Sequence, residues 1–472
     1  MRIKTDVCVI GAGSGGLSVA VGAAQLGART VLIERHKMGG DCLNTGCVPS
    51  KALLAAAKIA HAPNISKDFG IKIAPTIIDQ QLIQDHVKSI IQQIAPHDSV
   101  ERMESLGIKV FRESAYFINP HQLQVGSDII EAKRFVIATG SSPKLPHIPG
   151  LDSVPYHTNE TIFDLTEKID HLIVIGGGPI GMEMAQAHHR LGCKVIVLQS
   201  RRILPRDDQE LVDVVRQKFT QEGIVVHEHM HITQIKKQKD GFTVTCKNET
   251  GSFDISGSHL FIATGRQPNV SDLQLDRAGV VYTERGVDVD ACLRTSHKKI
   301  YAVGDVIGHH AFTHAASYHA SIVIQNMLFR WPRKMDGRKI PWVTYTDPEL
   351  AQIGMTEAEA IQHKLPHQIL RFPLTKNDRA QCERKTDGLI KVVLAKNGKI
   401  LGASICGDHA GDLIAFWILA IDKDLRMKDI AGTVLPYPTM SEIHKGISSA
   451  YFSPILFSKK VRMLVRLLLK LG

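Results

Sequence analysis

Two stretches of the chain repeat the same succession of apolar, glycine-rich and helical segments. Residues 7–10 form an apolar, β-branched run that predicts a strand, and a glycine-rich segment, an alanine-rich helical stretch and a second strand at residues 30–33 follow it. Residues 172–175 and 194–198 flank a second glycine-rich segment in the same way. A strand, a helix and a second strand in this order predict a βαβ unit, so we expect two such units.

Both glycine-rich segments read Gly-x-Gly-x-x-Gly between a strand and a helix. Glycines at these places let the backbone approach a pyrophosphate, whose charge lies at the amide end of the helix. Glu34 follows the first glycine of the first copy by 23 residues and could accept hydrogen bonds from a ribose, and Gln199 occupies the same place in the second copy. We therefore predict two dinucleotide-binding domains. Their motif glycines are Gly11, Gly13 and Gly16 in the first copy and Gly176, Gly178 and Gly181 in the second.

The C-terminal third of the chain has a different pattern. Strand-like runs at residues 388–395 and 399–405 precede an apolar helix near residues 412–421, and no phosphate-loop motif occurs there. The overall prediction is an α/β protein with two Rossmann-like domains and a C-terminal α+β domain that makes contacts rather than binding a nucleotide. We expect the first nucleotide domain at 1–150 with 271–340, the second at 151–270, the contact domain at 341–455 and a tail at 456–472.

Composition limits the class of protein. The 472 residues are 44% apolar and 22% charged, which suits a folded protein of several domains, and eight cysteines are too few for a disulfide scaffold. The net charge of +10 comes without a zinc-finger spacing or a basic arm, so we expect no nucleic-acid partner. Residues 7–28 carry no charge, but six of them are glycine and they begin as a strand, so we predict neither a membrane span nor a signal peptide, and a cytoplasmic location.

Cys42 and Cys47 are separated by four residues and precede a helix that we expect at residues 50–60. The same spacing occurs in metal clusters, but no further Cys or His pair lies nearby, so we predict a reversible disulfide and no metal site. A helix start stabilises a thiolate and lowers the pKa of the cysteine there, which is Cys47. Cys42, further out, is better placed to exchange with a substrate.

The segment around these cysteines resembles the active-site signature of the class I pyridine nucleotide-disulfide oxidoreductases, the family of dihydrolipoamide dehydrogenase, glutathione reductase and mercuric reductase. The resemblance covers nearly the whole chain. It includes Ala-Thr-Gly at 138–140 and 263–265, a segment at 300–305 that resembles the second FAD motif, and a segment at 345–351 that resembles the start of the dimerisation domain. It implies a homodimeric flavoenzyme whose active site is shared between subunits.

The resemblance also implies residue roles. Cys47 would be the charge-transfer thiol against the flavin, Cys42 would exchange with substrate, and Lys51 would pair with Glu183 near the flavin. Glu34 would bind the adenosine ribose, Asp305 the ribityl chain, and the helix start at His314 would face the flavin pyrimidine. The FAD positions implied besides the first-copy glycines are Glu34, Lys51, Thr139, Gly140, Asp305 and His314. The nicotinamide-cofactor positions implied besides the second-copy glycines are Gln199, Arg201, Arg202 and Gly265.

The second dinucleotide unit lacks the acidic residue that usually binds the ribose 2′-hydroxyl of NAD. Gln199 stands there instead, and Arg201 and Arg202 follow it. Two cations could meet a 2′-phosphate, so the segment favours NADP(H) over NAD(H). The alternative is that both arginines are simply solvated.

The chain departs from the family pattern near its end. The disulfide-reducing members have a histidine base from the partner subunit where this chain has Tyr437, although Thr439 and Glu442 are kept. Tyrosine has a pKa of about 10 against about 6.5 for histidine, so it is a poor base that can still donate a hydrogen bond. His444 lies seven residues on, about two turns or ~10 Å if both lie on one helix, and is not expected to replace it. Tyrosine here resembles the mercuric reductases, but their C-terminal cysteine pair is missing.

The tail at residues 457–472 contains five cations and no acid, with the cations and the aliphatic residues on separate stripes. This predicts a basic amphipathic helix that lies either on an anionic membrane, at its inner face, or on its own dimer. We expect electrons to pass from NAD(P)H through FAD to Cys42–Cys47 and on to a small-molecule acceptor near Tyr437 and Glu442 of the other subunit. The alternatives are a mercuric-reductase-like metal reductase, a dihydrolipoamide dehydrogenase-like enzyme, a membrane-surface quinone reductase and a slow-turnover flavin redox sensor.

Overall fold

The structure is a computed structural model that describes residues 1–249 and 251–471. The chain divides into two compact units. The first contains Met1–Ser200 and His227–Gly337, and the second contains Arg201–Val226 and the chain from Arg338 onward. Residues 201–226 thus group with the C-terminal part of the chain, although we expected them inside the second nucleotide domain. The domain boundaries given above stay a prediction.

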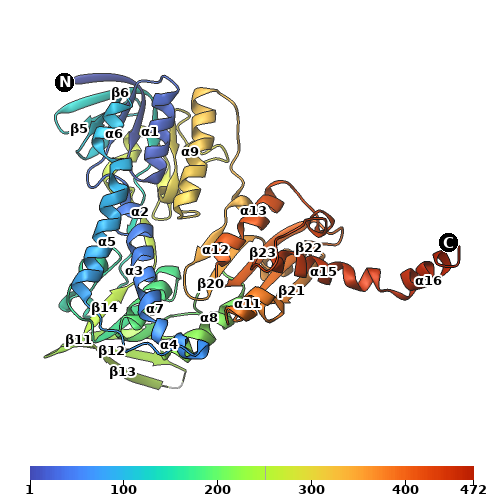
Figure 1. The fold of residues 1–472 in the computed structure, drawn as a ribbon. Helices are drawn as coiled ribbons and strands as arrows, with labels where there is room; N and C mark the ends of the chain where they lie inside the picture. Colours follow the sequence, from blue (N-terminus) through green and yellow to red (C-terminus); the bar gives the residue numbers. More distant parts are fainter. Residues whose placement is uncertain (250, 472) are drawn as a thin grey trace. The chain divides into compact units, whose positions relative to one another are not determined.

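The first unit contains a seven-stranded sheet in the order β3-β2-β1-β6-β5-β4, with β18 pairing β6. Strands β3, β2, β1, β6 and β18 run parallel, and β4 and β5 form an antiparallel extension. Helices α1 and α9 lie side by side (Figure 1). The strands and helices are β1 (Arg2–Ile10), β2 (Thr30–Ile33), β3 (Ile108–Phe111), β4 (Ala115–Asn119), β5 (Gln122–Val125), β6 (Asp128–Ile137), β18 (Ile300–Ala302), α1 (Ser14–Gln25) and α9 (Thr313–Leu328).

The second predicted βαβ unit forms a smaller parallel sheet in the order β10-β9-β8-β14. Its strands are β8 (His171–Ile175), β9 (Lys194–Leu198), β10 (Val225–His227) and β14 (His259–Ile262), and α7 (Pro179–Arg190) connects β8 to β9. Parallel pairing of β8 with β9 repeats that of β1 with β2, and β14 pairs β8 as β6 pairs β1. The α/β fold with two repeated nucleotide-type units is therefore confirmed.

Among its described residues, the first unit also contains three further small sheets and five further α-helices. An antiparallel sheet contains β11 (His231–Gln238), β12 (Gly241–Asn248) and β13 (Gly251–Gly257). Two two-stranded sheets pair β7 (Ser141–Pro143) with β15 (Arg266–Pro268) and β16 (Tyr282–Thr283) with β17 (Gly286–Val287). The helices are α2 (Gly40–Asn44), α3 (Cys47–Ala60), α4 (Ala62–Ser66), α5 (Gln80–Ile94) and α6 (Val100–Ser105). Helix α3 packs against both α5 and α7 (Figure 1). It begins three residues before the start that we expected.

The second unit is built on an antiparallel five-stranded sheet in the order β19-β20-β23-β22-β21. The elements are β19 (Trp342–Thr344), β20 (Glu349–Gly354), β21 (His367–Pro373), β22 (Leu389–Ala395), β23 (Ile400–Gly407), α8 (Gln209–Glu222), α10 (Glu357–Gln362), α11 (Asp378–Cys382), α12 (Ala410–Leu413), α13 (Ala415–Asp422), α14 (Met427–Ala431), α15 (Glu442–Leu456) and α16 (Lys459–Leu468). The single apolar helix expected near 412–421 is instead two short helices, because the amide of Trp417 bonds the carbonyl of Ile414 in a tighter turn.

Strand β22 presents different residues to its two faces. Ile390, Val392 and Leu394 belong to the core that includes residues of α12 to α15. Because successive side chains of a strand point to opposite faces, Lys391 lies on the other face, where α8 packs. This face of the sheet therefore has to supply negatively charged partners for the buried ammonium group of Lys391.

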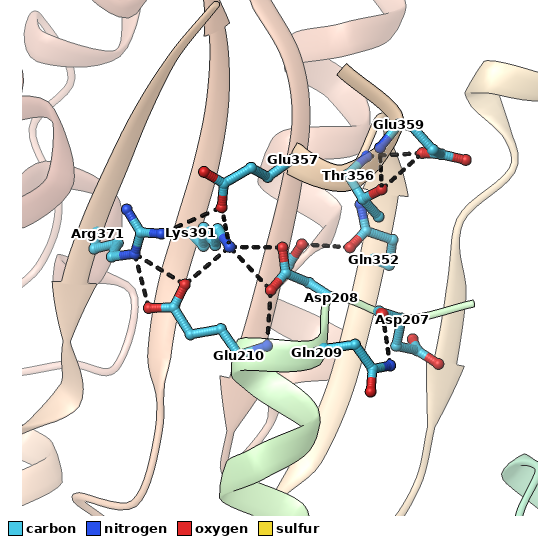
Figure 2. Close-up of polar contacts among 11 residues, drawn as sticks. Asp207, Asp208, Gln209, Glu210, Gln352, Thr356, Glu357, Glu359, Arg371 and Lys391 are labelled. Carbon is cyan, nitrogen blue, oxygen red and sulfur yellow. Dashed lines mark hydrogen bonds and ion pairs between the residues drawn. The ribbon is translucent and has the colours of Figure 1, made fainter. Parts of the chain in front are cut away.

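Three carboxylates surround Lys391 (Figure 2). The Nζ atom of Lys391 lies 2.8 Å from Asp208, 2.9 Å from Glu210 and 2.6 Å from Glu357, and only 4% of the lysine side chain is exposed. Arg371 completes this charge cluster with contacts of 2.7 Å to Glu210 and 3.2 Å to Glu357. The cluster joins the start of α8 to the sheet of the second unit.

No helix in residues 1–249 and 251–471 has both the length and the apolar character needed to cross a membrane. The uncharged stretch at residues 7–28 instead forms the end of β1, the glycine-rich turn and α1.

Candidate active site

Cys42 and Cys47 lie on two consecutive helices of the first unit, a short one and a longer one. Cys42 is in α2, and Cys47 is the first residue of α3, after Gly46, which provides no side-chain cap. Both are free thiols in the structure, and each shifts the pKa of the other. The Sγ atom of Cys47 also lies 3.4 Å from the Oγ1 atom of Thr313, the first residue of α9. Two helix starts therefore meet at the sulfur of Cys47.

The two thiols have opposite acidities. The pKa of Cys47 is lowered to about 6, chiefly because the Cys42 thiol donates a hydrogen bond to it, with help from the Thr313 hydroxyl and the charge of Lys51. These effects outweigh burial and the charge of Asp41, which both raise it. The pKa of Cys42 is raised, because its proton is held by Cys47 and its side chain is partly buried. These opposite shifts favour the thiolate form of Cys47 and the thiol form of Cys42.

Lys51 and Glu183 form an ion pair between α3 and α7. The Lys51 Nζ atom lies 2.8 Å from a Glu183 carboxylate oxygen, and Glu183 is 6% exposed whereas Lys51 is 37% exposed. Lys51 stands one helical turn after Cys47 on α3. The pairing expected from sequence is thus present, and it places a cation close enough to Cys47 to lower its pKa.

The first glycine loop has no room for a side chain at Gly11 or Gly16. A Cβ atom on Gly11 would lie 2.3 Å from the carbonyl oxygen of Ala138, and one on Gly16 would lie 1.9 Å from the carbonyl oxygen of Gly11. Gly13 stands at the N-terminus of α1 without a side-chain cap. The free amides of the helix and the bare backbone suit a pyrophosphate, so these residues fit a dinucleotide. Both oxygens of Glu34 accept backbone hydrogen bonds, from Ala12 at 2.7 Å and His36 at 2.7 Å.

The second glycine loop repeats this geometry. A Cβ atom on Gly176 would lie 2.2 Å from the carbonyl oxygen of Ala263, and one on Gly181 would lie 1.9 Å from that of Gly176. Gly178 begins α7 without a side-chain cap. The amide of Gly177 donates to Gln199 Oε1 at 2.9 Å, as that of Ala12 does to Glu34. The second loop therefore fits a dinucleotide equally well.

The arginines expected to select the nicotinamide cofactor do not belong to the same unit as Gln199. Arg201 and Arg202 are exposed and lie in the segment Arg201–Val226 of the second unit. Their role toward a 2′-phosphate stays a prediction. Gly265 has a φ of +125°, a conformation that favours glycine.

Asp305 lies in a polar network that also reaches the cysteine segment. Ser141 donates a hydrogen bond of 2.7 Å to Asp305, and burial raises the pKa of the Asp305 carboxyl. Arg266 lies 3.7 Å from Asp305 and 3.4 Å from Asp41, the residue beside Cys42. Asn159 donates to Asp41 at 2.9 Å from the other side. This network connects the Asp305 turn to the helix that carries Cys42.

The sequence analysis did not single out Thr313 or Arg266 as residues of the site. Thr313 stands beside the predicted His314, and Arg266 directly follows the second Ala-Thr-Gly, so their positions next to motifs were signals that could have found them. His314 itself is exposed and stacks on Phe312, with ring centroids 5.3 Å apart. The hydroxyl of Thr139 donates to the carbonyl of Asn269 at 2.7 Å, and Gly140 has a φ of +67°.

Tyr437, Glu442 and His444 all lie in the second unit. Tyr437 is 69% exposed and donates a hydrogen bond of 3.0 Å to Asp378, which raises the pKa of the Tyr437 hydroxyl. Tyr437 precedes α15, whereas Glu442 is its first residue, so our assumption that Tyr437 and His444 share one helix was wrong. His444 is nevertheless unsuited as a base. It is buried, it accepts a hydrogen bond of 3.0 Å from Trp417, and burial lowers its pKa to about 4.

Comparison with known proteins identifies the class of this protein. Residues 5–320 match the pyridine nucleotide-disulphide oxidoreductase family, and residues 340–446 match the dimerisation domain of pyridine nucleotide-disulphide oxidoreductases. The chain belongs to this family. It is accordingly a flavoprotein disulfide oxidoreductase enzyme, of a family that binds FAD and NAD(P)H, and its dimerisation domain indicates a homodimer.

Similar proteins differ in activity. The mercuric reductase of Streptomyces lividans is 35% identical over 458 residues, which is 95% of this chain and 97% of the relative. The dihydrolipoyl dehydrogenase of Geobacillus stearothermophilus is 32% identical over 450 residues, which is 93% and 95% of the two chains. A solved structure of the HOCl-induced flavoprotein disulfide reductase RclA from Escherichia coli, as a Cu(II) complex, superposes with a TM-score of 0.85 at 27% identity, covering 94% of this chain and 99% of that one. These similarities define the class of enzyme without naming its electron acceptor.

Proposed function

We propose that this oxidoreductase uses NADPH to reduce a Cys42–Cys47 disulfide, and that the reduced pair passes two electrons to a small-molecule acceptor in the cytoplasm. The proposal is supported mainly by the lowered pKa of Cys47 at the start of α3. Bound FAD would supply the transfer of two electrons between the nicotinamide cofactor and the disulfide. Gly11, Gly13 and Gly16 would hold its pyrophosphate.

The two cysteines would have different tasks. Reduction of the disulfide takes two electrons and one proton, because the product is one thiol and one thiolate. Cys42, whose pKa is raised, would hold the proton, and Cys47 would hold the negative charge under the influence of Thr313 and Lys51. Glu183 would fix the position of the Lys51 ammonium through their ion pair.

The acceptor would be one that requires no general base. We propose that Tyr437 and Glu442 of the partner subunit face the acceptor, as the family resemblance implies. The raised pKa of Tyr437 keeps its hydroxyl protonated at neutral pH, so it could donate a hydrogen bond but could not take the proton of the Cys42 thiol when that thiol attacks a disulfide acceptor. A thiophilic metal ion or a quinone suits this arrangement better than a disulfide.

Replacement of Tyr437 by histidine tests this reasoning. Turnover with NADPH would be measured for lipoamide, a water-soluble quinone and Hg(II). Tyr437→His should raise lipoamide turnover at least about tenfold, because a general base contributes factors of 10² or more in suitable sites. Tyr437→Phe is the matched control and should give no gain. Equal lipoamide rates in all three proteins would contradict the missing-base explanation, and a wild type that turns over none of the acceptors would favour the slow redox sensor.

Selection of NADP(H) over NAD(H) would depend on Arg201 and Arg202. The absence of an acid at Gln199 and the exposure of both guanidinium groups support this assignment. Replacing both arginines by glutamine should raise the KM for NADPH and leave that for NADH unchanged. An equal change of both KM values, or none, would show that the arginines are only solvated.

A further inference from the structure

The C-terminal helix α16 has an apolar face and a basic face. Val461, Leu464, Val465 and Leu468 recur at the spacing of one face of a helix. The cations Lys459, Arg462, Arg466 and Lys470 follow the same period along the opposite side, with Lys460 beside the apolar face. The side chain of Ser458 accepts a hydrogen bond of 3.4 Å from the amide of Val461, so α16 has its own N-cap and begins separately from α15.

The apolar face of α16 is not covered by the rest of the second unit. Leu464, Val465, Leu467 and Leu468 are between 47% and 57% exposed, and Leu469 is 76% exposed. Figure 1 shows α16 at the end of the red segment, beyond α15 and away from the sheet of its own unit. The exposed apolar surface continues backward through Phe457, Leu456 and Ile455. Exposed apolar side chains that gather on one short segment mark a contact with a membrane or with another molecule.

The charge of the segment indicates which contact this is. The last acidic residue of the chain is Glu442, and the tail after it contains only cations among its charged groups. Within the described residues, none of the five cations of the tail forms an ion pair. A second copy of the chain carries the same net charge of +10, so it offers no complementary surface on average. Anionic lipid headgroups supply the missing negative charge, and the acyl region below them suits the leucines.

We propose that α16 anchors the enzyme to an anionic lipid surface. The helix lies in the plane of the interface, with Leu464 and Leu468 toward the acyl chains and Arg462 and Arg466 toward the phosphates. Its ten residues are about 15 Å long, too short to cross a bilayer, so the contact is peripheral and reversible. The anchor would place the proposed electron transfer at a lipid surface, and this proposal holds whichever acceptor the enzyme uses.

Binding of the full-length holoenzyme to vesicles tests the proposal. Flotation would compare vesicles of mixed phosphatidylglycerol and phosphatidylcholine with vesicles of phosphatidylcholine alone. We expect binding only to the mixed vesicles, weakening as NaCl rises from about 0.1 to about 1 M and the Debye length falls from ~10 to ~3 Å. Replacing Arg462 and Arg466 by glutamine should weaken partitioning by about 25-fold, since each cation contributes a factor of about five. Leu464→Glu with Leu468→Glu should abolish it.

Matched variants separate this contact from general effects of charge and hydrophobicity. The control for charge is Lys236→Gln with Lys237→Gln, which removes two exposed cations on β11. The control for hydrophobicity is Ile77→Glu with Leu82→Glu, which changes two exposed aliphatic residues. Neither double variant should alter vesicle binding. Absence of wild-type binding, or equal binding to both vesicle types, would overturn the proposal. It would also be overturned if Leu464→Glu with Leu468→Glu converted the dimer to a monomer in light scattering, because a second copy would then cover the face. Normal flavin content shows that each variant is folded.

Discussion

At the scale of single residues, the chemistry rests on the ionisation of one sulfur atom. Cys47 stands at the first position of α3, contacts Cys42 and Thr313, and feels the charge of Lys51. A thiolate is the reactive form of cysteine, and a pKa of about 6 makes it the main form at neutral pH. The neighbours of Cys47 therefore control the reactivity of the pair.

Thr313→Val removes one of the donors to Cys47. The valine cannot donate a hydrogen bond, so we expect the pKa of Cys47 to rise by about one unit, since a hydrogen bond to a charged group contributes roughly 1.5 kcal/mol. The rate of alkylation of the reduced enzyme by iodoacetamide, measured against pH, gives this pKa directly. Thr313→Ser keeps the hydroxyl and should titrate like the wild type. A valine variant with the wild-type midpoint would show that the 3.4 Å contact has no effect on the thiolate.

At the scale of elements, helix α8 is tied to the sheet of the second unit by buried charges. Lys391 meets carboxylates from the start of α8 and from Glu357, while Arg371 joins Glu210 to Glu357 (Figure 2). Asp207 precedes this cluster and accepts a hydrogen bond of 2.8 Å from Trp342. Buried charges of this kind are stable only as a complete set, because removing one partner leaves the others uncompensated.

Lys391→Met removes the cation at the centre of the cluster. We expect the free energy of unfolding of the second unit to fall by about 3–5 kcal/mol, because three carboxylates lose their shared partner. Urea unfolding followed by tryptophan fluorescence reports on this unit through Trp342 and Trp417. Lys399→Met is the control, since Lys399 pairs with Asp424 at the surface and should cost less than about 1 kcal/mol. Equal losses in both variants would contradict a special role for the buried cluster.

Asp207 gives the second unit a pH dependence of a definite sign. Burial raises its pKa to about 6, so the carboxylate form is disfavoured in the folded protein. A group with a raised pKa contributes stability below its unfolded pKa of about 4, and that contribution is lost as the pH rises to about 6. Asp207→Asn keeps a hydrogen-bond acceptor for Trp342 but cannot ionise. The unfolding free energy of this variant minus that of the wild type should therefore increase between pH 4 and pH 6, by at most about 3 kcal/mol. A difference that is constant with pH would contradict this account.

Most of the fold that could be predicted from the sequence followed from the local pattern of apolar residues. Residues 30–33 and 194–198 are strands at the expected bounds, because short apolar runs next to glycine-rich turns have few alternatives. The pairing of Lys51 with Glu183 was accessible only through the family resemblance, since 131 residues separate them in the chain. The network of Arg266, Asp41 and Asp305 was not predictable, because it depends on how distant loops meet. The assignment of residues 201–226 to the second unit likewise depends on buried charges that local patterns do not reveal.

At the scale of the whole molecule, the chain uses the same glycine loop twice. Gly11 and Gly176 make nearly identical close approaches to Ala138 and Ala263, so the two loops can each receive a dinucleotide. Both loops lie in the same unit as the cysteine pair, and the second immediately precedes helix α7, which carries Glu183, the partner of Lys51. We infer that the two loops hold the two cofactors of one electron-transfer path that ends at Cys42 and Cys47.

Reduction of the full-length flavoprotein by one equivalent of NADPH without oxygen tests this arrangement most directly. A long-wavelength charge-transfer absorption band requires a thiolate against the oxidised flavin, so the wild type should show the band after one equivalent. Cys42→Ser keeps the Cys47 thiolate but has no disulfide to accept the electrons, so it should show the band before NADPH is added and lose it as the flavin is reduced. Cys47→Ser should lack it. A band that persists in Cys47→Ser, or purified protein that is colourless and cannot be reconstituted with FAD, would contradict the account.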